Sequence, residues 1–221
     1  MKDPCKYGGK KVLLVEGKTD CHVILALRSY YKIPENFGIY QCGGDLEVLK
    51  RLNALILQPA PPERIGVILD ADYGNIESRW GQVREKLKNH SYSMPGQPAP
   101  NGTIIEGGED IPVIGVWLMP DNQTSGLLED FLMPMVPAKA IEAASACVKK
   151  AESTGVARFK KPHRSKAVIH TYLSWQDEPG RPLGQSITSL ALQPDTGLAE
   201  TFVNWLKRLF PDEVSPGNRG R

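Results

Sequence analysis

The stretch from Val12 to Asp20, VLLVEGKTD, constrains the fold of this chain more than any other. Four apolar residues, two of them β-branched valines, run directly into Glu16, a pattern typical of a buried strand. Gly17 permits a sharp turn after the strand, and Thr19 can cap a following helix. A carboxylate at the exit of a buried strand must be hydrated, paired or bound to a metal ion. The stretch therefore predicts a strand, a turn and a helix, with an acid at the turn that needs such a partner.

Apolar runs and helical periodicity predict the order of the other elements. We expect strands at residues 11–16, 37–41, 64–72 and 111–119. We expect helices at residues 19–31, 45–57, 76–89, 126–132, 138–152, 162–175 and 197–210. The proline- and glycine-rich segment 91–108 is expected to be a loop or a hairpin insertion. Strand–helix–strand order predicts an α/β fold with a mostly parallel central β-sheet flanked by helices, followed by a helical C-terminal part.

The length of 221 residues suits one good-sized domain with additions. We expect residues 1–135 to form the α/β core. Residues 136–221 are expected to form a helical C-terminal extension that packs on the same domain. Trp117, Trp175 and Trp205 lie on apolar faces and are expected in the core, whereas His90, His163 and His170 show no catalytic triad pattern.

Composition and cysteine spacing limit the possible classes of protein. The net charge is +2, so the sequence has no global polycationic signal for nucleic acid, and any polyanion must be bound locally. No apolar run approaches the ~20 residues of a membrane span, and no secretory leader is evident. The four cysteines are scattered and match no zinc pattern, so we expect them to be reduced and the protein to be cytoplasmic. They are Cys5, Cys21, Cys42 and Cys147.

Acidic residues follow two of the expected strands. Glu16 ends the first, and Asp70 and Asp72 end the third. In a parallel sheet the carboxyl ends of the strands share one edge, where open α/β folds place their ligand site. Residues i and i+2 of an extended chain point to the same side, so both aspartates are expected to reach one site. Asp20, at the start of the first helix, would add a fourth carboxylate.

Such a cluster predicts a divalent metal centre. Mutual repulsion would raise the pKa values of the carboxyl groups unless cations neutralise them. Oxygen ligands suit Mg²⁺ or Mn²⁺, and a pair of such ions is a common device for phosphoryl transfer. The pair Glu129–Asp130 could add a ligand from the next loop. Asp20 alone can instead be a helix cap, and Asp130 can be a surface residue.

Two motifs carry a family resemblance. VEGKTD at residues 15–20, followed by LDAD at residues 69–72, resembles the Toprim domain of topoisomerases, bacterial primases and OLD-type nucleases. The sequence is most similar to small bacterial stand-alone Toprim proteins related to the OLD nuclease domain. Segments PDNQTSGLLEDFL and SKAVIHTYLSWQDEPGRPLGQ also fit that group, so the resemblance covers about residues 10 to 210.

The resemblance implies a magnesium-dependent nuclease that hydrolyses phosphodiester bonds with one or two ions. Glu16, Asp70 and Asp72 would hold the catalytic metal, Asp20 and Glu129 would hold a second, and Lys166 would stabilise charge in the transition state. The substrate would be DNA rather than RNA, in DNA repair or phage defence. OLD proteins carry an ATPase domain that this sequence lacks, so a separate ATPase partner is expected. Local phosphate contacts are expected from Lys18, Arg158, Lys160, Lys161 and Arg164, although such a basic run can equally be a solvated helix start.

Two other functions remain open. ILDAD also resembles the nucleophile motif of haloacid dehalogenase-type phosphatases, in which Asp70 would attack phosphorus and Asp72 would act as the acid. In that family the motif normally ends the first strand, whereas here it ends the third. The third possibility is a catalytically silent binding module that keeps the Toprim shell.

Overall fold

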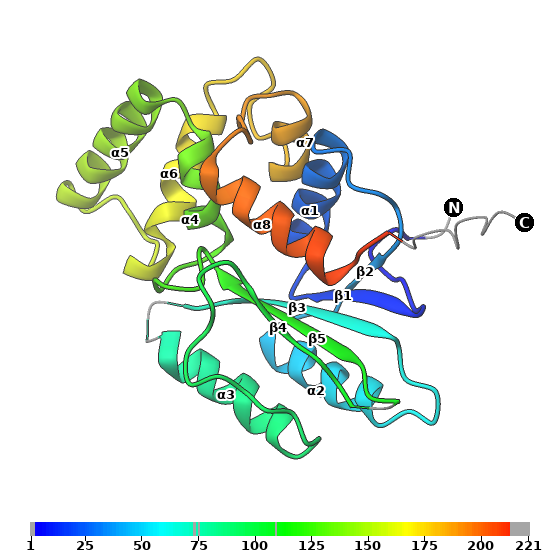
Figure 1. Ribbon diagram of the computed structural model, residues 1–221. Coiled ribbons are helices and arrows are strands. Elements are labelled where there is room, and N and C mark those ends of the chain that lie inside the picture. The colour runs from blue at the N-terminus through cyan, green and yellow to red at the C-terminus, as the bar shows by residue number, and fades with distance from the viewer. Residues whose placement is uncertain (1–2, 73, 75, 109, 213–221) are drawn as a thin grey trace, which may run out of the picture.

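A five-stranded, mostly parallel sheet forms the centre of the computed structural model, which describes residues 3–72, 74, 76–108 and 110–212. The strands are β1 (Lys11–Val15), β2 (Gly38–Gln41), β3 (Arg64–Asp70), β4 (Thr103–Ile105) and β5 (Val113–Met119). Their order in the sheet is β2-β1-β3-β5-β4 (Figure 1). Neighbouring strands are parallel except β4, which runs antiparallel to β5. The predicted α/β fold with a mostly parallel sheet is confirmed.

Helices cover both faces of this sheet. The α-helices are α1 (Lys18–Tyr30), α2 (Asp45–Ile56), α3 (Ile76–Lys88), α4 (Leu128–Leu132), α5 (Ala138–Ser153), α6 (Arg164–Leu173), α7 (Leu183–Thr188) and α8 (Gly197–Leu209). Two 3-10 turns, η1 (Met133–Met135) and η2 (Lys161–His163), precede α5 and α6. Figure 1 shows α2 and α3 on one face, and α1 and α8 on the other.

Strand alternation divides the core into two layers. Leu13 and Val15 of β1 point into one buried cluster, together with side chains of α1 and the C-terminal helices. Val12 and Leu14 point into the other, with side chains of α2 and α3. Because successive side chains of a strand face opposite sides, each strand contributes to both layers. The parallel strands are therefore almost wholly buried, as their near-continuous apolar runs predict.

Helix α8 approaches the sheet closely over two paired glycines. Gly66 of β3 is in register with Gly115 of β5. A Cβ atom at Gly115 would lie 2.3 Å from a methyl carbon of Leu209, and one at Gly66 would lie 2.5 Å from a methyl carbon of Leu13. Side chains at these positions would push the helix and the neighbouring strand away. The last helix of the C-terminal part therefore shares its hydrophobic layer with the sheet. Residues 213–221 of the expected extension and residues 1–2 of the expected core lie outside the described residues.

The segment 91–108 contains the edge strand β4, which pairs antiparallel with β5 as the expected hairpin would. Two other expectations differ from the structure. Helix α7 lies in a stretch for which no helix was expected. The prediction that Trp175 is a core residue is wrong, because 48% of it is exposed, whereas Trp117 and Trp205 are fully buried.

The prediction that all four cysteines are reduced is also wrong. Cys5 and Cys21 form a disulfide, and Cys42 and Cys147 are free thiols. The backbone of residues 5–7 runs antiparallel along β2 and brings Cys5 to within 5.9 Å of Cys21, Cα to Cα. Sequence spacing gave no sign of this pairing because it depends on where the N-terminal segment packs. Among the described residues, no helix is long and apolar enough to cross a membrane.

Candidate metal site at the carboxyl edge of the sheet

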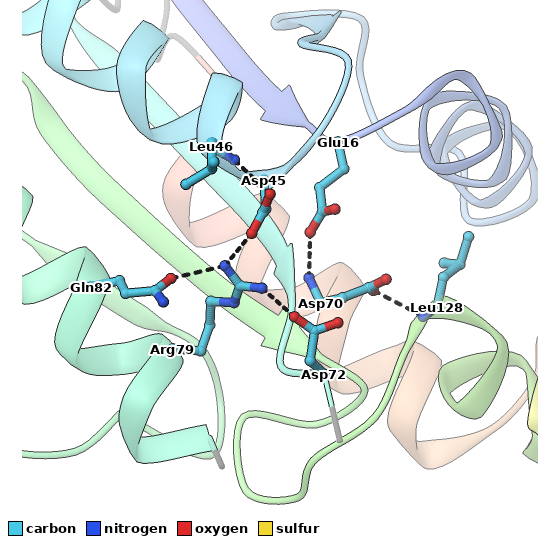
Figure 2. A network of polar contacts seen from close by, with 8 residues as sticks. All are labelled: Glu16, Asp45, Leu46, Asp70, Asp72, Arg79, Gln82 and Leu128. Atoms are coloured by element: carbon cyan, nitrogen blue, oxygen red, sulfur yellow. Dashed lines mark hydrogen bonds and ion pairs between the residues drawn. The ribbon is translucent and has the colours of Figure 1, made fainter. Parts of the chain in front are cut away.

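The ends of β1 and β3 meet through a direct contact between two of the predicted site residues. The backbone N–H of Asp70 donates a hydrogen bond to Oε1 of Glu16, at 2.8 Å (Figure 2). The two strands are parallel neighbours, so their carboxyl ends lie at the same edge. Residues that are far apart in sequence are thereby brought to one place by the sheet.

The Asp70 carboxylate points from β3 towards the start of α4. Its Oδ1 accepts a hydrogen bond from the backbone N–H of Leu128, at 3.0 Å. Burial, together with the nearby carboxylates of Glu16 and Asp20, raises the pKa of Asp70 to about 8. Burial also raises the pKa of Glu16 to about 7, although the Asp70 N–H partly offsets this. Among the described residues neither carboxylate forms an ion pair, and the charge of Arg79 lowers the pKa of Glu16 less than burial raises it.

Next to this pair lies a cavity of about 420 Å³. Its walls come from α1, the end of β3, α4, α6 and the residues at the start of α7. The cavity brings together five residues predicted from sequence, namely Lys18, Asp20, Asp70, Glu129 and Lys166. Carboxylates from three separate elements therefore face one space.

Lys166 and Glu129 form an ion pair within the cavity wall. Lys166 Nζ lies 3.2 Å from Glu129 Oε1. The Glu129 side chain is 5% exposed, whereas that of Lys166 is 51% exposed. The buried carboxylate thus has a cation beside it, and the lysine keeps about half of its surface open to a ligand.

Asp20 both caps α1 and lines the cavity. Its Oδ2 accepts a hydrogen bond from the backbone N–H of Gly17, at 3.1 Å. Burial, followed by the repulsion of Glu129, raises its pKa. Asp130 has the same capping role in α4, where its Oδ2 accepts the N–H of Leu127 at 2.8 Å. In each acidic helix start, one carboxylate stabilises the first turn.

Asp72 and Asp70 have different partners, and the prediction that both carboxylates reach one site stays a prediction. Asp72 lies beyond the end of β3 and has φ of 56°, in the left-handed region. Its carboxylate pairs with Arg79, while that of Asp70 points to Leu128 (Figure 2). The alternation rule holds only for extended chain, and the chain turns between these two residues.

Arg79 and Asp45 belong to this region, although neither was predicted from the sequence. Arg79 is 7% exposed and contacts Asp45 Oδ2 at 2.7 Å and Gln82 Oε1 at 2.9 Å (Figure 2). The hydrogen bond from Arg79 lowers the pKa of Asp45. A signal for Asp45 was present, because it opens the helix that follows the second strand and so must lie at the same sheet edge. No sequence pattern indicated that Arg79 would lie at this edge, because its contact with Asp72 depends on the turn after β3.

The predicted basic run is divided by the structure. Lys161 and Arg164 line a separate cavity of about 540 Å³, beside Asp130. Arg164 Nε also lies 3.3 Å from Glu152 Oε2. Arg158 and Lys160 are exposed and line neither this cavity nor the acidic one. Of the predicted phosphate contacts, Lys18 lies in the wall of the acidic cavity.

The donor atoms at this edge are those that a hard divalent cation prefers, since carboxylate oxygens suit Mg²⁺ and Mn²⁺. Glu16, Asp20, Asp70 and Glu129 are four acids beside one cation, Lys166. The raised pKa values of Glu16 and Asp70 come first from burial and then from the neighbouring carboxylates. In the part of the chain that the structure describes, however, no group of three or more His, Cys, Asp or Glu side chains is arranged so that it could hold a metal ion. The chemistry of the donors therefore fits a divalent metal, whereas their spacing in this structure does not form a ligand set.

Comparison with known proteins places the chain in one family. No curated protein matches it, and no solved structure matches it. A family model described as "Protein of unknown function (DUF3226)" matches residues 10–211, which include every element from β1 to α8. The chain therefore belongs to the DUF3226 family.

Proposed function

We propose that this protein is a divalent-metal-dependent nuclease that hydrolyses phosphodiester bonds. The observation that supports this best is the cavity in which Asp20, Asp70 and Glu129 face one space with Lys166, next to Glu16. Glu16, Asp20 and Asp70 have raised pKa values, and such groups gather at functional sites.

The proposed metal ligands are Glu16, Asp20, Asp70 and Glu129. A Mg²⁺ or Mn²⁺ ion bound there would activate water and stabilise the charge on the phosphoryl oxygens. Asp20 keeps one oxygen on the Gly17 N–H, which fixes its carboxylate towards the cavity. Asp72 differs from the others, because its ion pair with Arg79 holds it on the α3 side.

Lys166 is the proposed electrostatic stabiliser of the transition state. Its half-exposed ammonium group lies in the cavity wall beside Glu129. A cation held in place before the reaction stabilises developing negative charge without the cost of reorganisation. The ion pair with Glu129 would keep Lys166 in that position.

The resemblance to Toprim and OLD-type nucleases supports the same reaction, since Glu16 and the Asp70–Asp72 pair follow the first and third strands. By extension we propose DNA as the substrate, a cytoplasmic location, and a separate ATPase partner in DNA repair or phage defence. Disulfides are rare in the reducing cytoplasm, so the one between Cys5 and Cys21 is the observation that speaks against a cytoplasmic location.

The phosphatase alternative has less support from the geometry. It requires Asp72 as a general acid beside the nucleophile Asp70. The Asp72 carboxylate instead forms an ion pair with Arg79, so it is already engaged with another partner (Figure 2).

Incubation of the purified protein with supercoiled plasmid, linear DNA and RNA, in Mg²⁺, Mn²⁺ or EDTA, tests the proposal. The proposal predicts cleavage in either metal, none in EDTA, and none by Glu16→Gln or Asp70→Asn. Asp195→Asn, which changes an exposed acid before α8, serves as the matched control and should cleave normally. Rapid hydrolysis of p-nitrophenyl phosphate without cutting of any nucleic acid would favour the phosphatase. No activity on any of these substrates would favour the silent binding module.

A further inference from the structure

Two helices present the same pair of side chains to the acidic cavity. Lys18 and His22 lie on α1, and Lys166 and His170 lie on α6. All four line the cavity, and all four are exposed. In each helix the lysine precedes the histidine by four residues, so the two side chains project from one face, a turn apart. We call these four residues the basic rim.

The cavity lining combines buried acids with exposed bases. Asp20, Asp70 and Glu129 are partly or wholly buried, whereas the basic rim is open to solvent. Lysine and histidine nitrogens can donate hydrogen bonds to phosphate oxygens, whereas ionised carboxylates can only accept them. A ligand with several phosphate groups suits both, with one phosphate at the acids through a metal and another along the rim.

Close packing of α7 on α1 fixes the backbone of His22, one of the rim residues. A Cβ atom at Gly184 would lie 2.5 Å from the backbone oxygen of His22. Because Gly184 has no side chain, α7 lies directly against this turn of α1, and Pro182 and Leu183 complete the cavity wall. The position of His22 is thus set by a backbone-to-backbone contact rather than by a mobile side chain.

Cavity size limits what can enter. A volume of about 420 Å³ lies within the range of roughly 300–1,000 Å³ that small-ligand sites have. Such a space suits one or two nucleotides of a flexible strand rather than a rigid duplex.

We propose that the basic rim binds the phosphates adjacent to the scissile one in an unpaired nucleic acid strand, with His22 and His170 as phosphate-contacting residues. This inference rests on the proposed nuclease function and names the form of its substrate. The strand lies between α1 and α6, with its scissile phosphate over Asp70 and its neighbouring phosphates against Lys18, His22 and His170.

Binding can be tested separately from cleavage in an Asp70→Asn background, because the proposal predicts that this variant does not cleave the strand. Fluorescence anisotropy of a labelled single-stranded oligonucleotide gives the dissociation constant at several salt concentrations. His22→Ala and His170→Ala should each weaken binding roughly tenfold, since a hydrogen bond to a charged group is lost. Lys18→Ala should also reduce the slope of log K against log salt by about 0.7, the value for one phosphate contact in a single strand. His163→Ala and Lys139→Ala change exposed residues outside the cavity and should bind as the parent does.

Thermal unfolding separates a phosphate-contacting role from a structural one. His22 and His170 are exposed, so His22→Ala and His170→Ala should keep the Tm of the parent while they lose affinity for the strand. Unchanged oligonucleotide binding by the rim variants would overturn the proposal. So would a large decrease in Tm that accompanies the loss of binding, or equal affinity for a blunt duplex and a single strand. If the rim variants lose binding but no variant cleaves anything, the rim stands and the nuclease assignment fails. If the wild-type protein cleaves nucleic acid and the rim variants bind the oligonucleotide as tightly as the parent, the nuclease assignment stands and the rim proposal fails.

Discussion

The Glu16 carboxylate accepts the backbone N–H of Asp70 at 2.8 Å, and this contact joins the ends of β1 and β3. The hydrogen bond engages Oε1 of Glu16, whereas the Asp70 carboxylate takes no part in it and lies at the cavity. Neither carboxylate has a cation in direct contact among its described partners, whereas Asp45 and Asp72 share Arg79 and Glu129 has Lys166. Glu16 and Asp70 are therefore the groups whose behaviour should depend most on pH and on divalent metal.

Stability of the metal-free protein should fall as pH rises. The pKa values of Glu16 and Asp70 are raised from 4.5 and 3.8 to about 7 and about 8. The native state thus binds protons more tightly than the unfolded chain, so this contribution is complete at low pH and is lost as pH rises through the folded values. Thermal unfolding in EDTA, measured between about pH 5 and about pH 9, should show a decrease in Tm that Asp70→Asn makes smaller. A Tm that is flat or rises over this interval, with equal profiles for both proteins, would contradict the prediction.

Lys166→Met should abolish most cleavage while leaving the protein folded. The lysine is half exposed, so its loss removes a cation from the cavity rather than a core residue. Loss of one preorganised electrostatic contact commonly costs about 10²–10³ in kcat. Steady-state cleavage and circular dichroism measure the two effects, with Lys139→Met as the control. A variant that keeps its kcat would exclude Lys166 from the reaction.

Arg79→Ala should destabilise the protein. The guanidinium is 7% exposed and bridges Asp45 and Asp72, so its loss leaves two carboxylates without their cation. Because both carboxylates are partly exposed, we expect a decrease of roughly 1–3 kcal/mol in the free energy of unfolding by urea. Arg84→Ala, an exposed neighbour on α3, should change it by less than about 0.5 kcal/mol. Adding Asp72→Asn to Arg79→Ala should restore part of the loss, and the absence of any restoration would argue against the bridge.

The sheet and the convergence of Glu16 with Asp70 could be predicted because they depend on regular features. Apolar runs identify strands, and a parallel topology brings the ends of those strands together whatever the details of packing. The partner of Asp72 could not be predicted because the chain leaves the extended conformation at this residue, after the end of β3. Arg79, α7 and the wall formed by Pro182 and Gly184 were missed because they depend on contacts between distant elements, which leave no periodic pattern in the sequence.

The disulfide should contribute measurably to stability. Cys5 and Cys21 are 16 residues apart, and closing a loop of that size stabilises a protein by about 3 kcal/mol in the chain-entropy account. Cys5→Ser or addition of reductant should lower the urea midpoint, whereas Cys147→Ser, at an exposed free thiol, should not. Thiol titration of the denatured, unreduced protein should find Cys42 and Cys147 alone. Four reactive thiols would show that the disulfide does not form.

Calorimetric titration of Mn²⁺ into the metal-free protein tests the central claim most directly. The wild-type protein should bind Mn²⁺ with measurable heat, and the double variant Glu16→Gln, Asp70→Asn should remain folded and bind none. Equal binding by both proteins, or no binding by the wild type, would contradict the assignment of these carboxylates as a metal site.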